Sequence, residues 1–95
     1  MAVKIIIKRN VPKEKEPELL PMLIQLRALA VSQPGYISGE TLRNVDNPEE
    51  HLVISTWQST DSWKSWLSSK QREKIQKRID SVLGMETQYA IYYYR

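Results

Sequence analysis

The chain has 95 residues, of which 41% are hydrophobic, and it contains no cysteine. This length allows one domain, residues 1–95, and the absence of thiols excludes a disulfide framework and thiolate chemistry. The formal net charge is only +3, and no aromatic residues interleave with the basic ones, so we expect neither nucleic acid nor membrane as a partner. The apolar runs are too short to span a membrane and no secretory leader is recognisable, so we expect a soluble, cytoplasmic protein.

Residues 3–9 form the first predicted strand. Val3, Ile5 and Ile7 alternate with Lys4 and Lys8, which places the apolar side chains on one face and the lysines on the other.

A helix is predicted next, and it ends before the turn residues 33–35. Pro17 suits the start of a helix, whereas Pro21 lacks a backbone donor, so we expect an irregular first turn or a late start. The apolar side chains of this helix form a wide stripe that we expect to pack on a sheet, namely Leu19, Leu20, Leu23, Ile24, Leu26, Ala30 and Val31.

Two strand-like runs, Tyr36–Asn44 and His51–Gln58, flank a polar insert with turn chemistry and predict an antiparallel hairpin. The second run contains Trp57 and leads directly into a helix start, where Ser59 can accept hydrogen bonds from free backbone N–H groups.

Two helices are predicted after the hairpin. The first, residues 60–68, carries Trp63 and Trp66; the second, residues 70–83, follows a possible cap at Ser69 and is stopped by Gly84. We interpret the basic residues of the second helix as a solvated face, namely Lys70, Arg72, Lys74, Lys77 and Arg78. The last run, Thr87–Arg95, is a strand with aromatic side chains on both faces.

The order strand, helix, strand, strand, helix in two pieces, strand predicts an α+β fold. It is the ferredoxin-like split β-α-β arrangement, a four-stranded antiparallel sheet with helices on one face. We expect the other face to carry Ile, Trp and Tyr side chains rather than charge. Such a face requires a cover, so we predict a homodimer that pairs two sheets into a dimeric α+β barrel.

Four segments carry a resemblance to a known family, namely Gln33-Pro34-Gly35-Tyr36, Glu40-Thr41-Leu42-Arg43, Asp46-Asn47-Pro48 and Leu52–Trp57 followed by Ser59. In these segments the chain resembles the antibiotic biosynthesis monooxygenase domain, which forms a dimeric α+β barrel. The resemblance covers nearly the whole chain. It implies a monooxygenase that needs no cofactor and oxidises a small aromatic, phenolic or quinol substrate.

Individual positions differ in how well they match this family. Trp57 matches the strand-end Trp of its cofactor-free oxygenases, but Val53 stands where they have Asn and Trp63 where they have Tyr. Trp66 matches a Trp of the haem-degrading branch, in which a His ten residues later binds the iron; here that position is Gln76.

We therefore name seven candidate site residues. Trp57, His51 and Arg43 are the catalytic candidates, and the substrate-binding candidates are Trp66, Trp63, Tyr36 and Val53. His51 is the only histidine and is expected to be solvated at the start of its strand, which predicts no metal site. Its ordinary pKa near neutrality nevertheless makes it the default general base.

Two alternatives stay open. The first is a non-enzymatic barrel that binds a small molecule or is purely structural, with tryptophans that only pack; Val53 favours it. A pocket containing Trp57 and Trp66 would count against the purely structural version. The second is haem binding, for which Gln76 cannot supply an imidazole.

Overall fold

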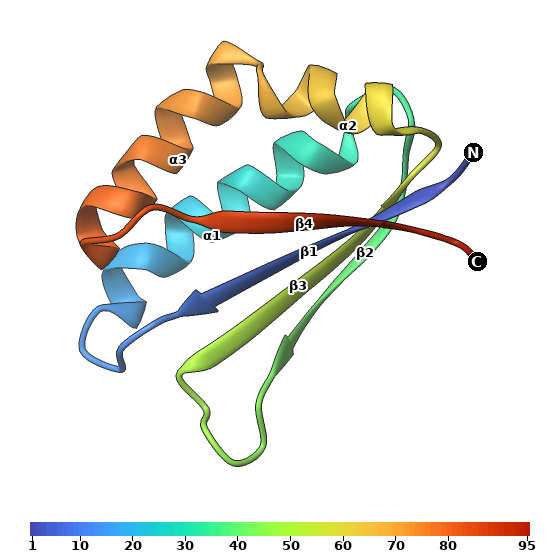
Figure 1. Cartoon of the computed structure of the whole chain (residues 1–95). Coiled ribbons are helices and arrows are strands. Elements are labelled where there is room, and N and C mark those ends of the chain that lie inside the picture. Colours follow the sequence, from blue (N-terminus) through green and yellow to red (C-terminus); the bar gives the residue numbers. More distant parts are fainter.

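The computed structural model describes all 95 residues and contains seven elements in the predicted order (Figure 1). These are β1 (Val3–Asn10), α1 (Glu16–Val31), β2 (Tyr36–Arg43), β3 (Glu50–Trp57), α2 (Thr60–Leu67), α3 (Lys70–Leu83) and β4 (Gln88–Tyr93). The strands form one sheet in the order β2-β3-β1-β4, and every neighbouring pair is antiparallel. The predicted α+β, ferredoxin-like fold is confirmed. No helix is long and apolar enough to cross a membrane.

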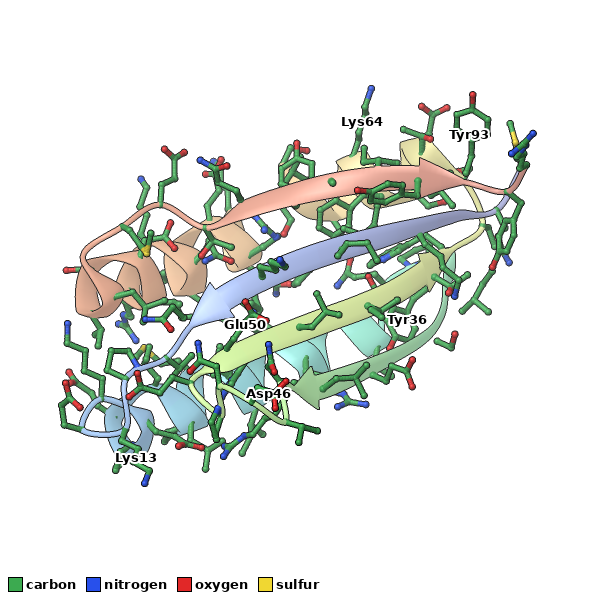
Figure 2. The ribbon with its side chains drawn as sticks, turned by 60° about the horizontal axis from the view of Figure 1, so that its bottom comes forward. Lys13, Tyr36, Asp46, Glu50, Lys64 and Tyr93 are labelled. Carbon is green, nitrogen blue, oxygen red and sulfur yellow. The ribbon has the colours of Figure 1, made fainter.

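The helices cover one face of the sheet, which we call the inner face, and Figure 2 shows the opposite outer face in front of them. Along β1 the alternation is strict, since Val3, Ile5, Ile7 and Arg9 are buried and the residues between them are not. Their partners on β3 share this inner face because directly paired residues point to the same side; these partners are Trp57, Ser55, Val53 and His51.

The outer face differs from the expectation in one respect. It carries Ile6, Ile54 and Tyr92 together with Lys4 and Lys8, so it is not free of charge. The expectation that it also carries a Trp is wrong. Trp57 pairs with Val3, and this register turns its side chain toward the helices.

Helix α1 also departs from the sequence interpretation. It begins at Glu16 and continues regularly through Pro21, so the late start is not observed. Pro21 has no backbone N–H, so the carbonyl of Pro17, four residues earlier, lacks its helical hydrogen-bond donor. Both prolines are exposed, which leaves this carbonyl close to water. The predicted stripe is too wide, because Leu20, Ile24 and Val31 are 48%, 60% and 52% exposed. Only the side of the helix that carries Leu19 meets the core.

The predicted caps are confirmed. Ser59 Oγ accepts a hydrogen bond from the Ser62 backbone N–H at 3.1 Å, and Ser69 Oγ accepts one from the Arg72 N–H at 3.1 Å. Gly84 ends α3 with a φ of 72°, a left-handed conformation that favours glycine. These caps fix where α2 and α3 begin, and hence which of their side chains face the sheet.

Two apolar clusters fill the space between the layers. The larger one joins β1 to the tryptophans and consists of Val3, Ile5, Ile7, Trp57, Trp63 and Trp66. The smaller one joins α1 to α3 and consists of Val11, Leu19, Ile75 and Ile79. A cavity remains beside the larger cluster, whose members Ile7, Trp57, Trp63 and Trp66 form part of its lining.

Candidate functional site: a cavity between the sheet and its helices

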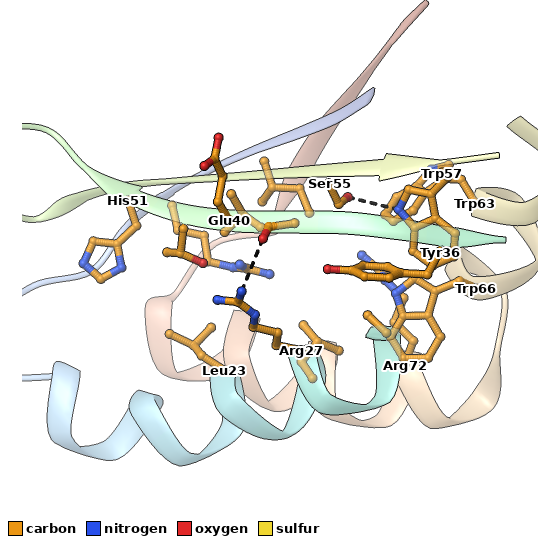
Figure 3. Close-up of a pocket in the computed structure, with 17 residues that line it drawn as sticks. Leu23, Arg27, Tyr36, Glu40, His51, Ser55, Trp57, Trp63, Trp66 and Arg72 are labelled. Carbon is orange, nitrogen blue, oxygen red and sulfur yellow. Dashed lines mark hydrogen bonds between the residues drawn. The ribbon is translucent and has the colours of Figure 1, made fainter. Parts of the chain in front are cut away.

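The cavity has a volume of about 120 Å³ and lies between the inner face of the sheet and the three helices (Figure 3). A single buried water needs about 10–15 Å³, so a cavity of this size has room for more than one small group. Six of the candidate site residues line it, namely Tyr36, His51, Val53, Trp57, Trp63 and Trp66. The complete lining comes from every element except β4, so segments far apart in the sequence meet at one space.

One end of the cavity is aromatic. The Trp57 ring lies edge-on to Tyr36 at a centroid distance of 5.4 Å and to Trp63 at 5.7 Å. The indole N–H of Trp57 donates a hydrogen bond to Ser55 Oγ at 3.0 Å, which fixes the orientation of the ring. Because the three tryptophans are buried among packed neighbours, this end offers rigid aromatic surfaces to the ring of a ligand.

Tyr36 reaches into the cavity across Gly39. In Figure 3 its hydroxyl group points from the tryptophan end toward the middle of the cavity. A Cβ atom on Gly39 would lie 2.5 Å from that hydroxyl, so only glycine leaves space for the ring in this position. The carbonyl of Gly39 also accepts a hydrogen bond from Arg27 of α1 at 3.3 Å, which connects β2 to the helix beneath it.

His51 stands at the opposite end of the cavity (Figure 3). The expectation that it is solvated is wrong: it is only 7% exposed, because its register opposite Arg9 turns it inward. Burial lowers the pKa of His51, with Arg43 and Arg9 also lowering it and Glu16 opposing them. Its Nε2 atom has no hydrogen-bond partner. His51 is therefore a neutral imidazole at pH 7 with a nitrogen free to exchange a proton.

Arg43 does not line the cavity. Its guanidinium forms an ion pair with Glu16 at the start of α1 and is half exposed. Arg43 is the register partner of His51, so it lies beside the histidine at the end of the sheet. In this position it acts on the charge of His51 rather than on a molecule in the cavity.

Two further residues line the cavity that the sequence did not single out, Arg9 and Arg72. Each is 7% exposed, so the interpretation of Arg72 as part of a solvated face is wrong. Arg72 lies three and seven residues before Ile75 and Ile79, which places it on the buried stripe of α3. Arg9 continues the buried alternation of β1. In both cases the sequence contains a basic residue at a position where the periodicity of the strand or helix predicts a buried apolar side chain.

The residues present do not fit a haem group. Gln76, which stands where the haem-degrading proteins of the resembled family have their iron-binding His, donates its amide N–H groups to Asp80 Oδ1 at 2.8 Å and Thr87 Oγ1 at 2.7 Å. The chain contains no group of three His, Cys, Asp or Glu residues that could hold a metal ion.

Comparisons with known proteins agree with this architecture. The model of the antibiotic biosynthesis monooxygenase family matches residues 2–78. Protein SchA of Streptomyces halstedii is 19% identical over 78 residues, which cover 82% of this chain but 20% of SchA. The chain thus spans about a fifth of the length of that curated relative.

Solved structures resemble the whole fold. A conserved protein from Methanosarcina mazei Go1 superimposes with a TM-score of 0.90 at 22% identity, over 100% of this chain and 94% of the other. SnoaB, a cofactor-independent oxygenase from Streptomyces nogalater, superimposes with a TM-score of 0.81 at 15% identity, over 99% of this chain and 93% of SnoaB. At these identities the likeness establishes the fold.

Proposed function

The chain belongs to the antibiotic biosynthesis monooxygenase family, and from that premise we propose that it is a monooxygenase that oxidises a small phenol or quinol without a cofactor. The observation that carries this proposal is the cavity, which combines a wall of three tryptophans with a buried, neutral histidine. SnoaB, with the same fold, is a cofactor-independent oxygenase, which supports the choice of reaction.

The reaction needs few protein groups, because the substrate itself supplies the electrons. Loss of a proton turns an electron-rich phenol or anthrone into an anion that can pass one electron to O₂. The carbon radical and superoxide then combine to form a carbon–oxygen bond. Cleavage of the O–O bond with loss of water leaves a carbonyl on the oxidised carbon. One oxygen atom of O₂ stays in the quinone and the other leaves in water.

In this proposal each residue has a separate task. Trp57, Trp63, Trp66 and Tyr36 hold the aromatic ring and keep water away from the reactive anion. His51 accepts the proton at its unpaired Nε2 atom, and burial keeps the imidazole neutral and ready for that step. Arg43 is a positioning residue: it sets the charge environment of His51 from outside the cavity.

The test is oxygen uptake with a panel of anthrones and hydroquinones, without added metal or flavin. We expect protein-dependent consumption of O₂ that falls at least about 100-fold in His51→Gln, the lower end of what a general base contributes. Lys64→Gln, on the exposed side of α2, is the matched control and keeps full activity. If the folded protein consumes no more O₂ than buffer across the panel, the proposal fails.

A second candidate function is binding without turnover, and Val53 favours it. Val53 lines the cavity where related oxygenases have a polar amide, so the reactive anion would lose one hydrogen-bond donor. Binding of panel compounds with no oxygen uptake would support this candidate. The purely structural alternative is disfavoured by the presence of a cavity that contains Trp57 and Trp66.

We further propose that the protein is a homodimer that pairs the outer sheet faces. No helix covers that face (Figure 2), and it leaves apolar side chains open to solvent, namely Leu42 and Tyr92, which are 44% and 58% exposed. Ile6 and Ile54 form a cross-strand pair at its centre. A second copy of the chain would remove this surface from water.

A further inference from the structure

Two buried arginines from different elements converge on a single oxygen atom. Arg9 on β1 and Arg72 on α3 each direct one terminal nitrogen toward Gln76 Oε1, at 3.4 and 3.5 Å. Both side chains line the cavity, and the Arg72 guanidinium also lies over the Trp63 ring at 5.5 Å. Two cations therefore meet beside the aromatic wall, at the end of the cavity that faces α3.

The orientation of Gln76 is fixed from behind. Its amide nitrogen donates to Asp80 Oδ1 and Thr87 Oγ1, so its carbonyl oxygen must face the arginines. One neutral oxygen at long hydrogen-bond distances is a weak partner for two guanidinium groups. The Nε atom of Arg9 is buried and has no partner at all.

No carboxylate neutralises the pair directly. Asp80 is the nearest acid, but its Oδ1 already accepts hydrogen bonds from Gln76, from the Thr87 N–H at 3.2 Å and from the Thr87 hydroxyl at 2.6 Å. The only ion pair of the chain is the one between Arg43 and Glu16. Asp80 and the exposed Glu73 act on Arg72 through their charges, but neither forms an ion pair with Arg72 or with Arg9.

The other charged groups of the cavity do not supply the missing anion. Arg27 adds a third guanidinium at the α1 side. Glu40 is the one acidic residue among the lining residues, and its register partner Ile54 places it on the outer face. Figure 3 shows the Glu40 carboxylate pointing away from Arg27 and Arg72. The lining is thus cationic, with no carboxylate inside it.

From this arrangement we infer that the ligand of the cavity carries a carboxylate, which pairs with Arg9 and Arg72 while its aromatic ring lies against the tryptophans. A carboxylate accepts hydrogen bonds at two oxygens and brings a negative charge, whereas the neutral Gln76 oxygen offers the two arginines one acceptor and no charge. The inference rests on the proposed function for the cavity as a substrate site, and it adds the acidic group that selects the substrate.

Holding Arg9 and Arg72 buried without a bound anion is unfavourable, which supports the inference that an anionic ligand binds there. Burial and the charge of Arg72 lower the pKa of Arg9 to about 10, while Asp80 opposes them. Burial likewise lowers the pKa of Arg72. Both groups remain protonated at pH 7, so the fold holds two cations in a region that disfavours charge. A bound anion would relieve both effects together.

The experiment compares ligands that differ in charge but hardly in shape. Benzoate and naphthoate are titrated against benzamide and naphthamide by calorimetry, under nitrogen so that no oxidation contributes. We expect each carboxylate to bind at least about tenfold more tightly than its amide, the ratio that one charge-assisted hydrogen bond provides. Equal affinities of carboxylate and amide would overturn the inference.

Three variants locate the charge that matters. Arg9→Met and Arg72→Met remove the guanidinium group while keeping an unbranched apolar stem, and they are expected to lose the preference for the carboxylate. Arg72→Lys retains a charge without the two-pronged geometry and is expected to keep part of it. Arg78→Met is the matched control, because it makes the same charge change on an exposed position of α3. Circular dichroism verifies that each variant is folded.

The outcomes separate this inference from the proposed oxygenase activity. An equal loss of preference in Arg78→Met and Arg72→Met would mean that overall charge, not this pair, attracts the carboxylate, and would overturn the inference. A preference that depends on Arg9 and Arg72 supports it even if no panel compound consumes O₂. Oxygenase activity without any such preference would leave the proposed function standing and remove the inference alone.

Discussion

The hydroxyl group of Tyr36 lies 2.5 Å from the position that a Cβ atom on Gly39 would occupy. The two residues are neighbours on β2, yet the ring of one passes over the backbone of the other before it enters the cavity. The shape of the aromatic end thus depends on the absence of a single methyl group.

Gly39→Ala should therefore displace the Tyr36 ring. We expect a loss of about 1–3 kcal/mol in the free energy of unfolding, the usual cost of overpacking, measured by urea denaturation. Binding of aromatic ligands should weaken in parallel, because the wall that Tyr36 forms moves.

Tyr36→Phe provides the matched rescue. Without the hydroxyl, the nearest ring carbon is 3.5 Å from the added methyl group, an ordinary contact. Gly39→Ala should thus cost much less in the Tyr36→Phe background than in the parent chain, a coupling that a double-mutant cycle measures. Equal costs in both backgrounds would show that Tyr36 is not what the methyl group meets.

The buried imidazole predicts a pH dependence of stability. Burial lowers the pKa of His51 in the folded state, so the unfolded chain takes up a proton first as the pH falls below about 6.5. The free energy of unfolding should decrease over this range and level off once the pH passes the lowered pKa of the folded state. Urea titrations at several pH values measure it.

The control for this effect is His51→Gln, which keeps a polar side chain but does not titrate. Its stability should depend less on pH between about 7 and 5 than that of the parent chain. A parent protein that becomes more stable as the pH falls through this range would contradict the lowered pKa.

Val53→Asn tests whether the missing amide limits turnover. Val53 pairs with Ile7 and Thr41 on the inner face, so an Asn there would place an amide in the cavity. We expect faster oxygen uptake with anthrones, and a loss of about 1–3 kcal/mol of stability from burying a polar group. Val53→Thr adds a hydroxyl but no amide and should give a smaller gain. An unchanged rate in folded Val53→Asn would rule out this explanation for Val53.

The proposed dimer can be broken without touching the cavity. Ile54 faces outward at the centre of the sheet, so Ile54→Lys would bury a charge in the interface and should weaken association by at least about tenfold. Sedimentation at micromolar concentration should give twice the chain mass for the parent and a shift toward the monomer for this variant.

Ile24→Lys is the corresponding control, because Ile24 is exposed on α1, away from the sheet. It should leave the sedimentation unchanged. A parent chain that sediments as a monomer would contradict the proposed dimer directly.

Local signals explain which parts of the structure could be predicted. The hairpin, the Ser59 and Ser69 caps and the Gly84 stop each depend on a few neighbouring residues, and all of them are observed. The order of strands and helices along the chain is compatible with few sheet topologies, and the ferredoxin-like sheet is one of them.

The cavity could be predicted only in part, because register decides what enters it. Trp57 and His51 lie on the inner face through their pairing with Val3 and Arg9, a relationship between residues far apart in sequence. Arg9 and Arg72 were overlooked because a basic residue is usually solvated. Their positions on the buried alternation of β1 and the buried stripe of α3 were the evidence against that default.

The central claim, that the cavity performs a reaction with O₂, is tested most directly by isotope labelling. Anthrone is incubated with the protein under oxygen-18 gas, and the quinone product is analysed by mass spectrometry. The proposed reaction predicts one labelled oxygen atom in the quinone, formed much faster with the parent chain than with His51→Gln. A quinone that acquires no label from the gas, or that forms equally fast without protein, would contradict it.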